Sequence, residues 1–209
     1  MKNLRISSLI LFVFLTVATG FTSCDESNDD VLTDDVISLT EDEESNLIFM
    51  REEEKLARDV YQYFYEKYDL NIFKNIASSE QTHMDAVLTI MEKYGVDDPA
   101  STETGVFNNA ELQELYDALI LQGDASLIDA LTVGATIEDV DIRDLDNAIE
   151  VTSKADIIDM YEKLACGSRN HMRAFTGQLD AQYETYIPQF ITQEEYEEII
   201  NGDHEQCGR

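Results

Sequence analysis

Residues 73–94 read FKNIASSEQTHMDAVLTIMEKY, and this stretch decides the fold. Its apolar side chains recur at alternating steps of three and four residues, the period of an α-helix with one buried face. Two positions on that face are polar, namely Glu80 and His83. Because residues three apart lie on one side of a helix, both side chains are expected to point inward. A buried carboxylate must be hydrogen-bonded, neutralised or bound to a metal ion, since an isolated buried charge is costly.

The same helical period runs through most of the chain that follows residue 40. It predicts long helices over 40–68, 127–148 and 157–178, and short helices over 109–121 and 194–200. Thr40 and Glu43 are spaced as a capping box for the first helix, and Gln122-Gly123-Asp124 is predicted to cap the helix that begins near residue 127. Alternating β-branched residues are scarce, so the sequence predicts an all-α fold.

Each of the other long helices also carries polar residues on its inward face. They are Glu54 on the first, Glu138 and Asp141 on the third, and Ser168 and His171 on the fourth. A single match is weak, because 44 of the 209 residues are acidic. Polar positions on four separate inward faces indicate a metal site. The alternative is a structural layer of mutually hydrogen-bonded Glu and His side chains.

Di-iron bundles of the ferritin-like superfamily take one Glu from each of two helices and a Glu-x-x-His pair from each of the other two. In chain order, this sequence offers Glu54, Glu80-x-x-His83, Glu138 and a Ser-x-x-His pair. The stretches EEKLARDVY (53–61) and GSRNHMRAF (167–175) resemble a family of that superfamily, a domain of unknown function related to rubrerythrins. The similarity covers roughly residues 45–200.

That resemblance implies a ferritin-like four-helix bundle with short additional helices. It also implies that Glu54 is a terminal ligand, that Glu80 bridges two metal ions beside His83, and that Glu138 and His171 bind the second metal. Oxygen and nitrogen ligands suit iron, with manganese and zinc as alternatives.

Ser168 departs from the pattern, which has a second bridging Glu at that position. Asp141, one turn after Glu138, is the candidate for the missing carboxylate. Without it, the site would hold a single metal ion or an asymmetric pair. Tyr61 and Tyr161 lie within two turns of predicted ligands, either as hydrogen-bond or electron donors or as ordinary core residues. By contrast, Glu52 and Glu53 are predicted to lie at the solvated edge of the first helix.

The ligand set favours an oxidoreductase that acts with dioxygen or peroxide. No catalytic residue is assigned beyond the metal ligands. The sequence has no Cys-x-x-Cys pair of the rubredoxin type, so a redox cycle would need an external electron donor. Two alternatives remain: a metal-binding protein without turnover, and a surface interaction protein with a structural polar core.

The N-terminal region indicates export. Residues 1–23 have a basic start, a short apolar run and a small-residue exit, as in a signal peptide, and the segment ends at Cys24 like a lipoprotein signal. Acidic residues then dominate, which predicts a disordered tether over 24–44, before a helical domain over 45–203 and a tail over 204–209. The expected location is the periplasm or the cell surface, as a membrane-anchored lipoprotein.

The composition limits the partners. A net charge of −30 disfavours nucleic acid and anionic membrane surfaces and favours metal cations. Membrane contact is therefore expected only through a lipid on Cys24, and a homodimer is left open. Cys166 points away from the inward face and is no ligand, but it can reach Cys207 if the tail folds back along the fourth long helix.

Overall fold

The computed structural model describes residues 38–208, and all of the regular secondary structure in that range is helical. The helices are α1 (Glu41–Tyr68), α2 (Asn71–Tyr94), α3 (Ala110–Gly123), α4 (Leu127–Glu150), α5 (Ala155–Ala181) and α6 (Gln193–Asn201). The all-α prediction is confirmed. The predicted signal peptide, Cys24 and most of the predicted tether lie outside the described residues. No helix within 38–208 is long and apolar enough to cross a membrane.

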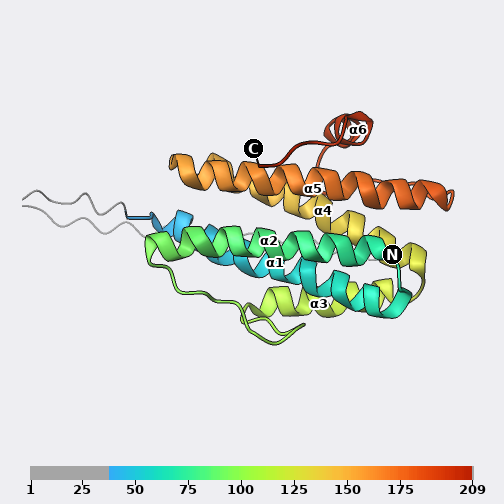
Figure 1. The fold of residues 1–209 in the computed structure, drawn as a ribbon, viewed down its shortest axis with the longest axis horizontal. Helices are drawn as coiled ribbons and strands as arrows, with labels where there is room; N and C mark the ends of the chain where they lie inside the picture. Colours follow the sequence, from blue (N-terminus) through green and yellow to red (C-terminus); the bar gives the residue numbers. More distant parts are fainter. Residues whose placement is uncertain (1–37, 209) are drawn as a thin grey trace, which may run out of the picture. The chain divides into compact units, whose positions relative to one another are not determined.

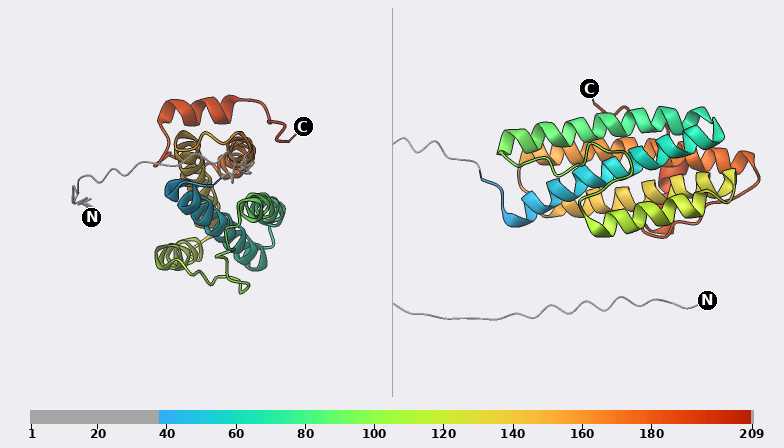
Figure 2. Two further views of the ribbon diagram at one scale, coloured as in Figure 1. Left: turned by 90° about the vertical axis from the view of Figure 1, so that its left-hand side faces the viewer. Right: turned by 90° about the horizontal axis from the view of Figure 1, so that it is seen from below.

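The four long helices lie side by side (Figures 1 and 2). Helix α1 packs along α2, and α4 packs along α5. These two pairs join through contacts of α1 with α4 and of α2 with α5, while α3 lies against α1 and α4, and α6 against α5. Every long helix therefore turns one face toward a common interior.

The first helix begins at a complete capping box. The Thr40 hydroxyl accepts a hydrogen bond from the Glu43 backbone N–H at 3.2 Å, and the Glu43 carboxylate accepts one from the Thr40 N–H at 2.8 Å. Four acidic residues in the first turn also face the positive end of the helix dipole. For these reasons residues 41–44 form the first turn of α1, in agreement with the predicted helix over 40–68 and not with a tether that extends to residue 44.

The cap of α4 differs from the prediction. Its N-cap is Ser126, whose hydroxyl accepts from the Asp129 N–H at 3.1 Å, so Gln122-Gly123-Asp124 only ends α3. Asn109 caps α3 and Thr192 caps α6. The Ser126 side chain reaches the third residue after it, which is the ordinary geometry of an N-cap, and serine is among the residues preferred there.

The interior consists of two apolar clusters with a polar layer between them. One cluster includes Phe64, Phe73 and Phe175, and the other includes Met50 and Val87. Along each long helix, the polar inward positions fall between a stretch belonging to one cluster and a stretch belonging to the other. The polar layer is therefore closed on both sides along the helix axes.

Helix α1 is buried on more sides than the single inward face that its sequence pattern predicts. The prediction that Glu52 and Glu53 are solvated is wrong, since both are buried. The Glu52 carboxylate accepts from the backbone N–H of Asn108 at 2.8 Å and thus holds the loop before α3. The same loop is held by buried Lys55, which donates to the carbonyls of residues 103 and 106. The loop and α3 cover the side of α1 that the sequence pattern assigned to solvent.

Candidate metal centre

Five of the six predicted ligands come together in the polar layer. Glu54, Glu80 and His83 form one cluster, and Glu80, Glu138 and His171 form a second, with the candidate ligand atoms of each cluster within 4.8 Å of one another. Each of the four long helices contributes at least one of these residues. Glu80 belongs to both clusters, so its carboxylate lies where a group shared between two ions would lie.

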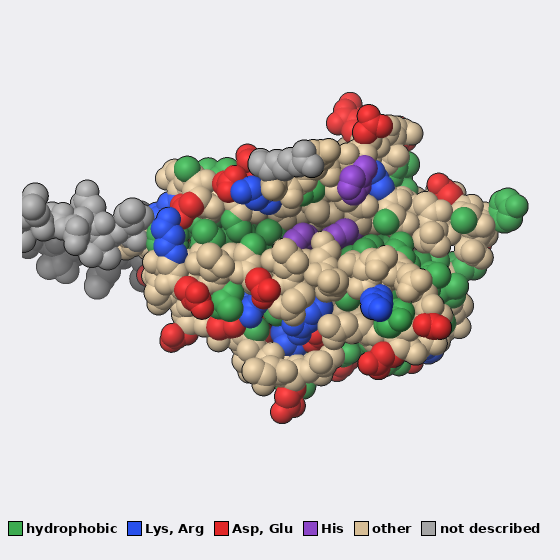
Figure 3. All heavy atoms as spheres, viewed as in Figure 1, with side chains coloured by type: hydrophobic (Ala, Val, Ile, Leu, Met, Phe, Trp, Pro, Cys, Tyr) green, Lys and Arg blue, Asp and Glu red, His purple; other side chains and the backbone are tan. Residues whose placement is uncertain are grey.

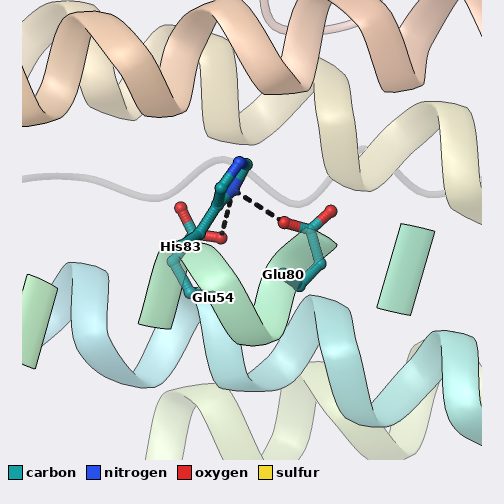
Figure 4. A group of neighbouring side chains, drawn as sticks. All are labelled: Glu54, Glu80 and His83. Carbon is teal, nitrogen blue, oxygen red and sulfur yellow. Dashed lines mark hydrogen bonds and ion pairs between the residues drawn. The ribbon is translucent and has the colours of Figure 1, made fainter. Parts of the chain in front are cut away.

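The first cluster is drawn in Figure 4, where the His83 imidazole points toward the carboxylates of Glu54 and Glu80. His83 Nδ1 lies 3.2 Å from Glu54 Oε2 and 2.8 Å from Glu80 Oε2. The i, i+3 spacing of Glu80 and His83 on α2 brings them to one side of the helix, and Glu54 approaches from α1.

The second cluster uses the other oxygen of Glu80. His171 Nδ1 lies 2.9 Å from Glu80 Oε1 and 3.3 Å from Glu138 Oε2. The His83 and His171 rings stack with their centroids 5.5 Å apart. The two clusters are thus related by an approximate symmetry, in which each imidazole faces one oxygen of the shared carboxylate and one carboxylate of its own.

Neighbouring side chains fix the orientation of the candidate ligands. Tyr61 donates a hydrogen bond from its hydroxyl to Glu138 Oε1, and His171 Nε2 lies 3.0 Å from the Ser79 hydroxyl oxygen. Metal-binding histidines commonly use their second ring nitrogen in this way, which fixes both the tautomer and the ring plane. Of the two tyrosines singled out by the sequence, Tyr61 therefore contacts the centre, whereas the buried Tyr161 hydroxyl has no hydrogen-bond partner within residues 38–208.

Unpaired buried atoms test whether a metal ion fits. Among the described residues, Glu54 Oε1 is buried without a hydrogen-bond partner, and leaving such a group unpaired costs on the order of 1–3 kcal/mol. Glu80 Oε1 and His171 Nδ1 lie 2.9 Å apart but make no hydrogen bond of good geometry. A divalent cation in the cluster of Glu54 and another between Glu80 and His171 would satisfy these atoms, so the donor set and its burial fit metal ions.

Opposing charges govern the histidines and the shared carboxyl. Burial alone would lower the pKa of His171, but the carboxylates of Glu80 and Glu138 outweigh it and raise that pKa to about 10. Burial likewise opposes the charged form of His83, yet Glu54 and Glu80 hold its pKa well above the usual value. For Glu80, burial favours protonation, but the two imidazoles hold the pKa below its ordinary value.

The outer carboxyls behave in the opposite way. Burial raises the pKa of Glu54 to about 7, partly offset by the nearby His83. Burial also raises the pKa of Glu138, and it raises the pKa of Asp141 well above the ordinary value, together with the charges of nearby Glu54 and Glu53. In the metal-free protein, Glu80 is therefore the anionic centre, and the surrounding carboxyls tend to hold protons.

The structure brings Asp141 into neither cluster. Its Oδ2 accepts a hydrogen bond from the Ser168 hydroxyl, which also lies 3.0 Å from the Leu164 carbonyl oxygen. Ser168 and Asp141 are thus hydrogen-bonded to each other and belong to neither cluster. Asp141 Oδ1 is buried and unpaired, so one oxygen remains free to interact.

Sequence reasoning missed three residues around the centre. Ser79 and Gly167 had no predicted role of their own, and Glu53 was predicted to be solvated. A Cβ added at Gly167 would lie 2.5 Å from His83 Nε2, so the absence of a side chain makes room for the imidazole. The i, i+4 relation of Gly167 to His171 was the available signal for a close approach at this level of α5. Gly134 on α4 makes room in the same way for the Phe175 ring, which would lie 2.5 Å from an added Cβ.

Gly167→Ala is expected to displace His83 and to weaken metal binding by at least about tenfold, the range seen when the support of a ligand is lost. Gly177→Ala is the matched control, because it lies on the same helix and its added Cβ meets nothing within 4 Å. Alanine there should stabilise the protein by roughly 0.5–1 kcal/mol. Metal titration and urea unfolding of both variants check the pair. Equal metal affinity in Gly167→Ala and the unmodified chain would contradict the close packing of His83.

Comparison with known proteins places the chain in a family. The protein named "Uncharacterized protein MJ0754" of Methanocaldococcus jannaschii is 55% identical over 168 residues, which are 80% of this chain and 91% of that protein. A solved structure described as the crystal structure of hypothetical protein MJ0754 from Methanococcus jannaschii is similar with a TM-score of 0.79 and 51% identity, covering 88% of this chain and 100% of that one. The model of a family described as an uncharacterized protein domain, DUF2202, matches residues 43–203. The chain belongs to the DUF2202 family.

Proposed function

We propose that this protein is a ferritin-like four-helix bundle that holds a pair of metal ions between its long helices. The observation that carries the proposal is the position of Glu80, whose two carboxylate oxygens face two separate Glu and His clusters. The order of the ligand residues along the chain agrees with that of di-iron carboxylate bundles, apart from Ser168.

In this proposal Glu54 and His83 would hold one ion, Glu138 and His171 would hold the other, and Glu80 would be a ligand of both. Iron is the preferred metal for a mixed carboxylate and imidazole site, with manganese and zinc as the alternatives. Asp141 is the sixth candidate, and its unpaired Oδ1 would have to turn toward the centre to act as a ligand.

The proposed activity is oxidoreductase chemistry with dioxygen or peroxide. A bound pair of redox-active metal ions would supply the electrons for reducing such an oxidant, and an external donor would restore them. The chain's own residues orient and shield this chemistry. Tyr61 holds Glu138, Ser79 holds the His171 ring, and the two apolar clusters keep bulk water from the carboxylates.

A structural polar layer is the rival function class. It is favoured by the 3.2 Å contact of His83 Nδ1 with Glu54, which pairs charges without any metal. A surface interaction protein built on such a core would need no ion at all. A metal-binding protein without turnover is intermediate, because it needs the ligands but no reaction with oxidants.

Measuring the metal content distinguishes these functional hypotheses. The chain purified without chelator should contain metal and should melt at a higher temperature with iron, manganese or zinc than after chelator treatment. If the protein is purified without metal and none of the three ions changes its melting temperature, both metal-binding hypotheses are excluded and the structural polar layer remains. If metal is bound, peroxide should change the optical spectrum of the ferrous form. An unchanged spectrum would favour metal binding without turnover.

Export and anchoring are part of the same proposal. The short apolar run ending at Cys24 supports a lipoprotein signal, and an external electron donor is then a partner outside the cytoplasm. Replacing Cys24 with serine should move the protein from the membrane fraction to the soluble fraction of disrupted cells. Unchanged fractionation would remove the lipid anchor from the proposal.

A further inference from the structure

A hollow of about 480 Å³ opens onto the histidine side of the clusters. Its lining includes His83, His171 and the Ser79 that contacts His171, with Ala86 and Thr82 from the exposed side of α2. Figure 3 shows histidine side chains, in purple, reaching this face of the molecule. His83 and His171 are each 8% exposed, whereas Glu54, Glu80 and Glu138 are at most 2% exposed. The imidazoles are thus the part of the centre that lies nearest to solvent.

The C-terminal segment, residues 202–208, forms one wall of this hollow through His204, Glu205 and Cys207. It contains no helix beyond the end of α6, and most of its side chains are exposed. A disulfide joins Cys207 to Cys166 on α5, which settles the pairing that the sequence left open.

Polar contacts hold the same segment on the turn of α5 that carries His171. The Glu205 carboxylate lies 2.9 Å from Arg169 Nε and 2.8 Å from Arg173 Nη2. Asn170 donates to the Glu205 carbonyl at 3.1 Å and accepts from the Glu205 N–H at 2.9 Å. These ion pairs are partly exposed and therefore weak, so the disulfide is the main restraint on the segment.

We propose that the hollow is the port through which divalent metal ions reach the buried ligands, and that the C-terminal segment is a wall of this port that loosens when the Cys166–Cys207 disulfide is reduced. The inference rests on the proposed metal centre. An external dithiol would supply two electrons and two protons: the S–S bond breaks, Cys166 and Cys207 become thiols, and the dithiol becomes a disulfide. Exposed Cys207 offers the sulfur at which such exchange can begin.

The charges around the hollow suit a cation. Behind the imidazoles lie the carboxylates of Glu54, Glu80 and Glu138. The lysine at the rim, Lys163, is paired with Asp159 at 2.6 Å. Arg169 and Arg173 share the carboxylate of Glu205, and the negative charges of Asp146 and Glu195 also act on Arg169. Without the covalent cross-link, the terminal segment is held on α5 by the partly exposed ion pairs of Glu205 and the hydrogen bonds to Asn170, and a chain terminus held in this way opens more readily.

One rate in the metal-free full chain tests this proposal: the uptake of cobalt(II), followed by its absorbance. Uptake should be several-fold faster in the reduced and desalted chain, and in the chain with both Cys166→Ser and Cys207→Ser, than in the oxidised chain. The final metal content should be unchanged.

A blocked port provides a second variant. Ala86→Trp places a large ring in the lining and should slow cobalt uptake in both redox states, whereas Thr89→Trp, on the exposed face of α2 outside the hollow, should not. Equal rates of cobalt uptake in the oxidised and reduced chains, with normal metal content, would overturn the redox-released wall and leave the proposed centre standing. A chain that takes up no metal in any form would overturn the centre and the port with it.

Discussion

Glu80→Gln is expected to abolish metal binding at both clusters, the largest effect of any single substitution in the chain. Each oxygen of Glu80 faces a different histidine, at 2.8 Å from His83 Nδ1 and 2.9 Å from His171 Nδ1. Glutamine keeps the shape of the side chain but replaces one oxygen with an amide nitrogen, which carries no negative charge and is no metal ligand. Both ions then lose the group that they share.

The same substitution at the outer ligands should have a smaller effect. Glu54→Gln and Glu138→Gln each remove a carboxylate from one cluster only, so each variant should keep the ion of the other cluster. Glu92→Gln, on the exposed face of α2, is the matched control and should bind metal like the unmodified chain. Elemental analysis after dialysis against a low concentration of the metal measures all four chains. Full metal content in Glu80→Gln would exclude a shared ligand and favour the structural polar layer.

Most of the candidate ligands could be predicted from the sequence, because the period of a helix shows which side chains face the interior. The side chains of Glu54, Glu80, His83, Glu138 and His171 interrupt apolar faces, and burial of those faces turns the interruptions inward. The order of helices also follows from the caps and breaks. The period does not, however, give the distance between residues on different helices. The sequence therefore placed Asp141 on an inward face but could not show whether it belongs to a cluster.

Other features could not be predicted because they depend on how different segments of the chain pack against one another. Glu53 was assigned to solvent because the pattern describes two faces of α1, whereas the loop before α3 and α3 itself cover a third. The role of Gly167 depends on a ring from another helix, 2.5 Å from where its Cβ would lie. The Cys166–Cys207 bond depends on the path of the chain after α6, which passes back over α5.

The metal-free protein is expected to lose stability as the pH rises from about 5 to about 9, while the metal-bound protein gains stability over the same range. The Glu54 carboxyl has its pKa raised from 4.5 to about 7, so the stability that its proton supplies is complete below pH 4.5 and is lost as the pH rises through 7. That change corresponds to on the order of 3 kcal/mol. His171, whose pKa is raised to about 10, acts in the same direction: its contribution is complete below pH 6.5 and is lost as the pH rises through 10. The pKa of Glu80 is lowered, so its contribution is lost only in acid, below this range.

Bound metal reverses the dependence because the ligands must give up their protons to coordinate it. Metal affinity therefore rises with pH, and the stabilisation by a fixed concentration of free metal rises with it. Urea unfolding at constant salt, with and without metal, should give two free energies of unfolding that diverge as the pH increases. Metal-free Glu54→Gln is the control, because it removes the step between pH 4.5 and 7 and should show a shallower decline there. If the metal-free chain instead becomes more stable from pH 5 to pH 9, the buried carboxyls hold no protons, and the layer is a set of charge pairs that needs no ion.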